Sequence, residues 1–212
     1  MRSADGAHRH VPARIAVLAY PGVNELDLFG AYAVLAKAAS VAPDELEVRL
    51  AGSVPHLSTS GGVPIGVTAD LRYFTAADAV VIPGGRGAAD AALDEELLAA
   101  VRDASAAGTP VYGVCSGALL IAAAGVARGR TVAVHHAKRG DLAPDSVGVV
   151  AAGLVRDGRL CTVGGDHRTS VKSVDLAFQL IKDLVPHLAA TVSEGMEIVP
   201  GRIARPELRS SS

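Results

Sequence analysis

The sequence predicts a single doubly wound α/β domain, in which helices cover both faces of a mostly parallel sheet. Apolar strand-like runs alternate with helical stretches, and the runs are continuously apolar, as is typical of strands buried on both faces. The length of 212 residues suits one domain with a sizeable core. Half of the residues are apolar and 20% are charged, which argues against disorder.

Two short polar tails flank the expected domain, which we place at residues 13–204. Residues 1–12 and 205–212 have neither the strand nor the helix pattern, and we expect both to be flexible. Neither an internal repeat nor a linker divides the sequence between them. That sequence is therefore expected to form one folding unit.

Strands are expected where short apolar runs stop at glycine, proline or polar residues. They lie at 14–20, 47–51, 79–82, 109–114, 131–134, 147–151 and 160–163, with a hairpin at 57–67 around a Gly-Gly pair. The strands at 14–20, 79–82 and 109–114 each end in residues that could do chemistry. Ligands of doubly wound folds bind outside the carboxyl ends of the strands, so we expect the site there.

Helices are expected at 25–39, 94–107, 116–124 and 170–184. In the first, an apolar set recurs at helical spacing and predicts the buried face: Leu26, Phe29, Ala33 and Val34. The second ends at Gly108, a suitable C-cap. The third is apolar all round, as expected of a buried helix.

Charge and composition exclude several classes of partner. The formal net charge is -2, no basic run occurs, and aromatic residues make up 3% without any Trp, so we expect neither nucleic acid nor an anionic membrane as a partner.

The two cysteines form no disulfide scaffold and favour a reducing compartment. No apolar run reaches the roughly 18 residues of a membrane span, and residues 1–12 lack the apolar core of a signal peptide, so the cytoplasm is expected. Zinc-site and P-loop motifs are also absent from the sequence, so we expect no metal and no cofactor.

The strongest functional motif is Gly113-Val114-Cys115-Ser116-Gly117, where a strand runs directly into a helix. This is the nucleophile-elbow pattern with cysteine in place of serine. The glycines permit a sharp turn that exposes the nucleophile in a strained backbone conformation. The helix N-terminus should lower the pKa of the Cys115 thiol, and the following N–H groups could bind an oxyanion. A buried structural cysteine is the alternative.

Glycines also follow the strand at 79–82, in the run Pro83-Gly84-Gly85-Arg86-Gly87. Adjacent glycines let backbone N–H groups approach a ligand, so Gly84 and Gly85 could contribute to an oxyanion or substrate site. The run is an incomplete dinucleotide fingerprint, because Asp90 stands where the last glycine belongs. A simple turn explains it equally well.

Asp27, just after the strand at 14–20, has two interpretations. Asn24 could be the N-cap of the following helix with Asp27 as its capping-box partner, and the spacing alone favours this. Alternatively, Asp27 could be a general acid or base beside Cys115. Glu25 lies two positions from Asp27, and helical residues two apart point away from each other, so at most one of the two carboxylates faces the elbow.

Two histidines could supply a partner for Cys115 in a Cys-His arrangement. His135 follows the strand at 131–134, and His167 follows Gly164-Gly165. Other polar candidates are expected to be structural: His56 and His187 on the surface, Cys161 in the core, and Lys172, Asp175, Lys182 and Asp183 on the solvated side of the last helix.

Taken together, these residues resemble the ThiJ/PfpI superfamily, whose fold is similar to that of class I glutamine amidotransferases. The resemblance runs from about residue 14 to about residue 184, and within the superfamily it points to the isocyanide (isonitrile) hydratase branch and to the ligand domains of certain AraC-type regulators. It is carried by Pro21-Gly22-Val23, Leu26-Asp27-Leu28, Ile82-Pro83-Gly84-Gly85, Val114-Cys115-Ser116-Gly117, Ala124-Gly125 and Val155-Arg156-Asp157-Gly158. No helix-turn-helix segment follows the domain, so a DNA-binding regulator is not expected.

The resemblance implies the addition of water to an isocyanide, which gives an N-substituted formamide. Cys115 would attack the terminal carbon as a thiolate and form a covalent thioimidate, while Asp27 would be the general acid/base. Asp27 and the Ser116 hydroxyl would position the water that releases the product. The resemblance also implies a homodimer.

The same resemblance implies a second group of residues that bind the substrate. Gly84 and Gly85 would shape the pocket and offer backbone N–H groups. From their positions in the sequence, and not from the resemblance, His135 and His167 are further candidates to contact the substrate or an oxyanion. With these assignments, residues that follow three different strands would line one pocket.

Departures from the hydratase pattern favour a different substrate. Ser116 replaces a threonine and keeps the hydroxyl. His136 stands where the hydratase has Trp, which removes a large apolar wall. The segment 164–169 is longer than the glycine-rich turn that it replaces, and its Asp, His and Arg bring charge to the expected pocket mouth.

Three alternatives to isocyanide hydration stay open. A glyoxalase- or deglycase-like member would act on a reactive carbonyl, although such members have Glu where Asp27 stands here. A natural-product enzyme could use the same Cys115 and Asp27. A non-enzymatic sensor would oxidise Cys115 or bind a ligand without turnover. Asp27 favours catalysis, because ligand binding does not need a proton shuttle, and Ser116 rather than His after the cysteine disfavours the protease and chaperone branch.

Overall fold

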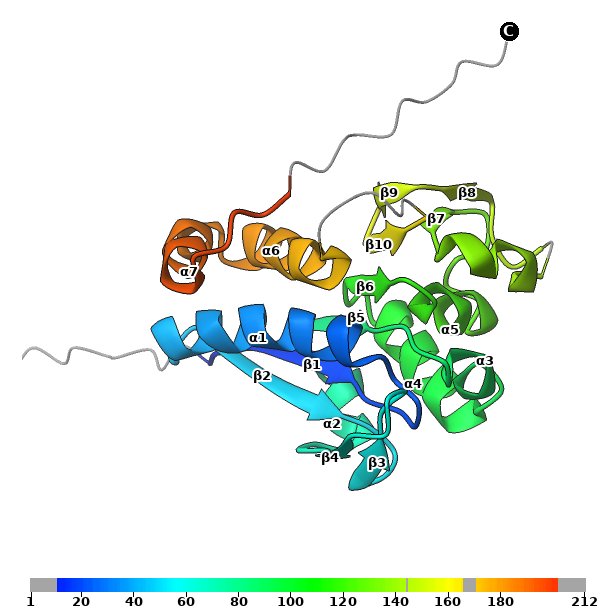
Figure 1. Cartoon of the computed structure of the whole chain (residues 1–212), viewed down its shortest axis with the longest axis horizontal. Coiled ribbons are helices and arrows are strands. Elements are labelled where there is room, and N and C mark those ends of the chain that lie inside the picture. The colour runs from blue at the N-terminus through cyan, green and yellow to red at the C-terminus, as the bar shows by residue number, and fades with distance from the viewer. Residues whose placement is uncertain (1–10, 144, 166–170, 202–212) are drawn as a thin grey trace, which may run out of the picture.

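A computed structural model of the chain describes residues 11–143, 145–165 and 171–201, and a six-stranded sheet lies at its centre (Figure 1). Along the sheet the strands follow the order β2-β1-β5-β6-β10-β9. Their bounds are β1 (Ala13–Leu18), β2 (Leu46–Ala51), β5 (Ala79–Ile82), β6 (Val111–Val114), β9 (Gly153–Asp157) and β10 (Leu160–Gly164). Every neighbouring pair is parallel except β9 and β10. The mostly parallel α/β fold that the sequence predicts is confirmed.

Helices cover both faces of this sheet (Figure 1). On one face lie α1 (Glu25–Val41), α6 (Lys172–Leu184) and α7 (Ala189–Met196), and on the other lie α2 (Leu71–Thr75), α3 (Ala88–Ala91), α4 (Glu95–Ala106) and α5 (Gly117–Ala123). Short 3-10 turns occur at His136–Asp141 and Pro186–Leu188. Within the described ranges, no helix combines the length and the apolar character that crossing a membrane requires.

Two small sheets lie outside the central one. β3 (His56–Ser58) and β4 (Pro64–Gly66) form the expected antiparallel hairpin. β7 (Thr131–Ala133) and β8 (Val149–Ala151) are both at predicted positions, but they pair with each other and not with the central sheet. The sequence analysis missed β9, an edge strand, because its exposed and half-buried residues do not form a continuous apolar run.

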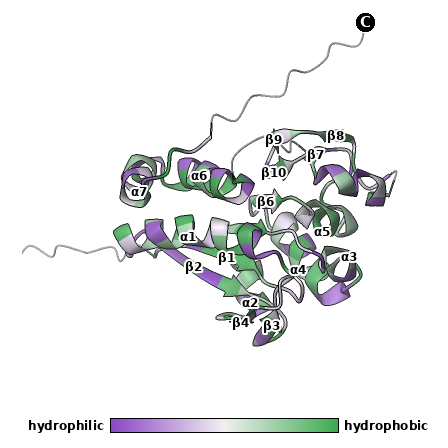
Figure 2. Ribbon diagram, in the orientation of Figure 1, coloured by the Kyte–Doolittle hydropathy of each residue, from purple (hydrophilic) through white to green (hydrophobic). Residues whose placement is uncertain are grey.

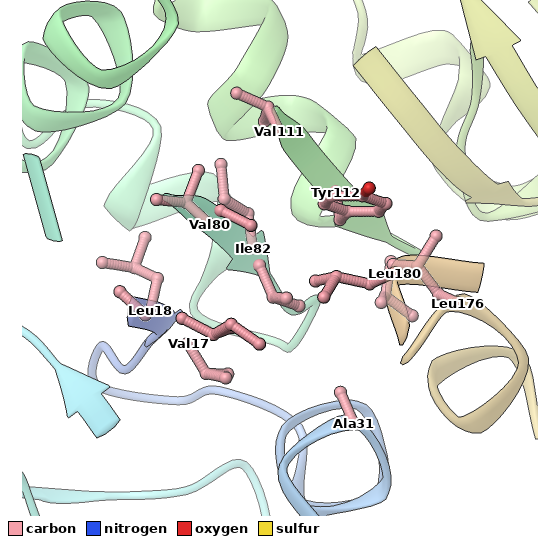
Figure 3. Close-up of a cluster of buried hydrophobic side chains, with 14 of the residues drawn as sticks. Val17, Leu18, Ala31, Val80, Ile82, Val111, Tyr112, Leu176 and Leu180 are labelled. Atoms are coloured by element: carbon pink, nitrogen blue, oxygen red, sulfur yellow. The ribbon is translucent and has the colours of Figure 1, made fainter. Parts of the chain in front are cut away.

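The core is built from the strands that are buried on both faces. All four residues of β5 and of β6 are buried, which explains why the sequence shows continuous apolar runs there. Figure 2 shows the hydrophobic colour on these central strands, and Figure 3 shows side chains of α1 and α6 meeting those of β1, β5 and β6. The residues labelled on this side of the sheet are Val17, Tyr112, Ala31, Leu176 and Leu180.

The buried face of α1 differs from the prediction. Leu26 is 60% exposed, and Phe29 and Ala33 are exposed as well, so of the predicted face only Val34 is buried. The buried side instead carries Leu28, Ala31, Val34, Leu35 and Ala38. Nearly the whole helix is apolar, so spacing alone did not determine which side faces the sheet.

One acid of α6 differs from the prediction that it is solvated. Asp175 is buried, and its carboxylate accepts a hydrogen bond from the backbone N–H of Gly201 (2.8 Å). Asp183 is exposed, as predicted, although it accepts a hydrogen bond from the Tyr112 hydroxyl (2.6 Å) and forms an ion pair with Arg156. The burial of Asp175 depends on the distant segment around Gly201, which the spacing of the helix does not reveal.

Candidate active site

The three strand ends that the sequence singled out meet at one edge of the sheet. β1, β5 and β6 are adjacent and parallel, so the residues that follow them lie side by side. A cavity of about 240 Å³ opens at this edge. Its lining consists of Asn24, Asp27, Gly85, Arg86, Cys115, Ser116, His135 and Lys138.

Cys115 occupies a strained turn between β6 and α5. Its φ of 58° lies in the left-handed region, which is uncommon for a residue other than glycine and costs about 1–3 kcal/mol. The backbone N–H of Cys115 donates to the carbonyl of Val163 (2.8 Å), which ties the turn to β10. A Cβ on Gly117 would lie 2.8 Å from the Pro83 carbonyl oxygen, so this position has no room for a side chain. The predicted strained elbow is confirmed.

Asp27 faces the elbow rather than completing a capping box. The Asn24 side chain accepts from the Asp27 N–H (3.1 Å), which confirms the predicted N-cap. The N–H of Asn24 donates to the Gly84 carbonyl (2.8 Å), so it does not donate to the Asp27 carboxylate and the capping-box interpretation is wrong. Instead, Asp27 Oδ2 accepts from the Gly84 N–H (3.2 Å), and the carboxylate hydrogen bonds to the Cys115 thiol.

Glu25 points away from the elbow, as the helical spacing predicts. Its carboxylate accepts hydrogen bonds from the Thr59 hydroxyl and from the Gly61 N–H (2.6 Å). The helix start therefore has one acid directed to the β3–β4 hairpin and one directed to Cys115. Only Asp27 lines the cavity.

Burial and Asp27 together suppress the acidity of Cys115. Burial raises the pKa of its thiol to about 12, with further contributions from the charge and the hydrogen bond of Asp27, while the Ser116 backbone N–H opposes the rise. The expected lowering of this pKa by the helix N-terminus is therefore wrong, because desolvation and a nearby carboxylate outweigh it. Burial also raises the pKa of Asp27, and the hydrogen bonds from Cys115 and Gly84 limit that rise. A pKa of about 12 keeps the proton on the Cys115 sulfur near neutral pH.

Gly84, Gly85 and Ser116 hold the catalytic side of the cavity in place. The Ser116 hydroxyl accepts from the Gly85 N–H (2.9 Å) and donates to the Gly85 carbonyl (3.2 Å). A Cβ on Gly84 would lie 2.7 Å from Ser116 Oγ and 2.8 Å from Asp27 Oδ2. The N–H groups of both glycines already donate to side chains, so in this geometry they act as supports of Asp27 and Ser116 rather than as free donors.

His135 also lines the cavity. Its backbone N–H donates to the Cys115 carbonyl (3.3 Å), and its Nδ1 accepts from the Ala137 N–H (3.2 Å). The ring therefore carries its proton on Nε2, which is a donor. Burial lowers the pKa of His135, as do the nearby His136, Lys172 and Lys138, which favours the neutral ring. His167 and the rest of the segment 166–169 lie outside the described residues.

Lys172 is a site residue that the sequence analysis missed. The Ser173 hydroxyl donates to the Leu26 carbonyl (2.8 Å), which packs the start of α6 against the first turn of α1. Burial raises the pKa of both Asp27 and Cys115, and the positive charge of Lys172 partly opposes this. Its position at the start of the helix that follows β10, at the same sheet edge as the elbow, was the one signal available in the sequence.

The described residues provide no metal site. No group of three or more His, Cys, Asp or Glu side chains among them is placed to hold a metal ion. The groups at this edge that can take part in chemistry include a thiol, an adjacent carboxylate and nearby hydrogen-bond donors.

A parallel sheet with a cysteine at a strained strand–helix turn defines a class of α/β proteins that share the cysteine elbow. Residues 13–182 match the DJ-1/PfpI family, and the chain belongs to this family. It is 32% identical over 173 residues to an isonitrile hydratase of Pseudomonas putida, an alignment that covers 81% of this chain and 72% of that protein. It is 35% identical over 96 residues to a deglycase of Pyrococcus horikoshii, covering 45% of this chain and 58% of that protein. The crystal structure of Drosophila melanogaster DJ-1beta has the same fold, with a TM-score of 0.75 at 22% identity, covering 89% of this chain and 99% of that chain.

Proposed function

We propose that the chain is a cysteine-dependent hydratase that converts an isocyanide to an N-substituted formamide. The observation that carries the proposal is the hydrogen bond between the Cys115 thiol and the half-buried Asp27 carboxylate, which both line the cavity. A nucleophile in contact with a proton acceptor is the arrangement that covalent catalysis needs. The identity to an isonitrile hydratase supports this choice of reaction.

The first step follows from the protonation state of the pair. Because the Cys115 pKa is raised to about 12, the sulfur carries its proton near neutral pH, and Asp27 takes that proton as sulfur attacks the terminal carbon. Asp27 then returns the proton to the same carbon. The product is a covalent thioimidate, R–N=CH–S–Cys115, and Asp27 is again ionised.

In the second step, water adds to the thioimidate carbon. Asp27 accepts a proton from the attacking water and passes it to the nitrogen as the C=N bond becomes a single bond. The hydroxyl on the same carbon then loses its proton to Asp27 and becomes the formyl C=O, while the C–S bond breaks. Asp27 returns this proton to the sulfur, and the formamide R–NH–CHO leaves. The sum is one isocyanide and one water consumed for each formamide formed.

The remaining predicted residues take positioning roles in this proposal. Gly84 holds Asp27 through its N–H, and Ser116 holds Gly85 through two hydrogen bonds. The Nε2–H of His135 is a candidate donor to the substrate nitrogen. A role for His167 stays a prediction.

A reactive carbonyl is the second candidate substrate, and the identity to a deglycase favours it. The same thiol would add to the carbonyl carbon while Asp27 moves the proton. A redox sensor has less support, because the thiolate is the form that oxidants attack and a pKa of about 12 leaves little of it.

A homodimer in the cytoplasm is also a proposal. We propose that a second copy of the chain covers the exposed apolar strip formed by Leu26, Phe29 and Ala33 on α1. Analytical ultracentrifugation of the wild type beside Leu26→Glu tests this. A monomeric wild type would exclude the dimer.

The proposed reaction is tested by following formamide formation from methyl isocyanoacetate. The wild type and Cys161→Ala should turn over, and Cys115→Ala should not. Turnover that survives in Cys115→Ala would overturn the covalent mechanism. A folded wild type that ignores isocyanides but consumes methylglyoxal would favour the carbonyl alternative.

A further inference from the structure

The cavity above Cys115 is built from polar and charged residues. Among the described residues that line it, none is aliphatic and none is Phe, Tyr or Trp. Pockets for neutral organic ligands are lined mainly by such apolar side chains. The walls of this cavity instead combine the carbon surface of its lining side chains with charged and polar ends, which suits a ligand that has both an apolar and an ionic part.

Positive charge gathers around the cavity that Cys115 and Asp27 line. Arg86 and Lys138 line the cavity, and Arg139 Nη2 lies 3.1 Å from where a Cβ on Gly165 would be, at the end of β10. Lys172 reaches the same region from the start of α6, which the Ser173–Leu26 hydrogen bond fixes against α1. These four cations lie in the same part of the sheet edge as three carboxylates: Glu25, Asp27 and Asp141.

Among the described residues, the carboxylates do not pair with all of these cations. Asp141 pairs with Lys138 (2.8 Å), and Glu25 is held by the Thr59 hydroxyl and the Gly61 N–H. Within the part of the chain that the structure describes, Arg139 and Lys172 form no ion pair with a carboxylate. Cations that lack a carboxylate partner beside a polar cavity are suited to an anionic ligand.

We propose that the substrate carries an anionic group, of which a carboxylate is the simplest, at the end remote from the reacting carbon. This inference rests on the proposed function and narrows it to isocyano acids. The reacting carbon would lie over Cys115, and the carboxylate would face Arg86 and Lys172. A cavity of about 240 Å³ is smaller than the roughly 300–1,000 Å³ typical of drug-sized ligands, so only a short chain would separate the two groups.

Alkylation of Cys115 tests the anion preference without requiring turnover. Iodoacetate and iodoacetamide both form an S–C bond and release iodide, but one carries a carboxylate and the other a neutral amide. Any change in thiol pKa affects both rates equally, so it cancels in their ratio. We expect the iodoacetate-to-iodoacetamide rate ratio at Cys115 to exceed that of free 2-mercaptoethanol and to decrease with added salt.

Variants that remove one positive charge show which side chains cause the preference of Cys115 for iodoacetate. In Lys172→Gln and in Arg86→Gln, we expect the ratio to fall about fivefold, the effect of losing one partly exposed charge contact. Lys182→Gln, on the same helix as Lys172, is the matched control and should leave the ratio unchanged. A wild-type ratio equal to that of the free thiol would overturn the proposal, as would equal effects in all three variants.

Measurements of turnover then test the anion preference separately from the proposed reaction. We expect kcat/KM to be higher for isocyanoacetate than for its neutral methyl ester, and Lys172→Gln to remove the preference. If both compounds are hydrated equally well, the reaction stands and the anion preference is wrong. If Cys115 prefers iodoacetate but neither isocyanide is hydrated, the anion preference stands and the proposed reaction is wrong.

Discussion

Cys161 lies within β10 and Cys115 just beyond the end of the neighbouring strand β6, and the two have very different surroundings. Cys161 lies inside β10 opposite Tyr112 of β6, with none of its surface exposed. Cys115 lies just beyond the end of β6, half-buried, in a left-handed backbone conformation and beside Asp27. Burial raises the pKa of both thiols to about 12.

The equal pKa values show that acidity does not distinguish the nucleophile here. Both thiols keep their proton near neutral pH. What Cys115 has in addition is a carboxylate in hydrogen-bond contact and a cavity from which a substrate can approach. The charged neighbours of Cys161 are Arg156 and Asp183, and that thiol lines none of the cavity.

Replacing each cysteine by alanine should give the largest contrast. Cys115→Ala is expected to lower kcat/KM by at least about 10³-fold, because no other group can form the covalent intermediate. Cys161→Ala should keep its turnover and lose about 1 kcal/mol of the free energy of unfolding, because it leaves a small void in the core. Steady-state kinetics and denaturant unfolding check the two results. Comparable loss of turnover in both variants would contradict the assignment.

Asp27→Asn should separate catalysis from thiol reactivity. We expect turnover to fall by about 10²–10⁴-fold, because the proton carrier is lost. Removing the carboxylate also removes a charge and a hydrogen bond that raise the Cys115 pKa, so alkylation by iodoacetamide at pH 8 should become faster. Cys161 serves as the internal control and should stay unlabelled. Parallel loss of turnover and alkylation would contradict this account of the pKa.

Gly84→Ala tests whether the Gly-Gly turn holds the acid in place. The added Cβ would meet Asp27 Oδ2 at 2.8 Å and Ser116 Oγ at 2.7 Å, so the carboxylate must move. We expect about a 10²-fold loss of kcat, the effect of a misplacement of about 1 Å. Gly140→Ala is the matched control, since a Cβ there would have no neighbour within 4 Å. Wild-type activity in Gly84→Ala would show that the position of Asp27 is not critical.

The smallest expected effect is a pH-dependent gain in stability in Asp27→Asn. Burial raises the Asp27 pKa in the folded state, so the folded protein binds this proton more tightly than the unfolded chain does. The wild type therefore loses stability as pH rises from the ordinary carboxyl pKa through the raised value, whereas asparagine does not titrate. The difference in Tm between variant and wild type should grow by a few degrees between pH 4 and pH 7. A difference that does not change with pH would exclude this titration.

The sequence by itself determined the elements and the elbow. Continuous apolar runs predicted the central strands β1, β5 and β6, and the glycines around Cys115 predicted a sharp strand–helix turn. These features depend on residues that are adjacent in the chain, where sterics and local burial leave few options. The parallel arrangement then implied that the strand ends would share one edge.

Only the tertiary structure decided how the side chains at that edge are used. It turned Asp27 toward Cys115 and Gly84, the latter 57 residues away in sequence, instead of toward the helix cap. It also determined which face of α1 is exposed, brought Lys172 to the site and raised the thiol pKa that the local motif predicted to fall. The reason is physical: desolvation and charge–charge interactions depend on which distant segments pack together, and adjacency in the chain does not fix that packing.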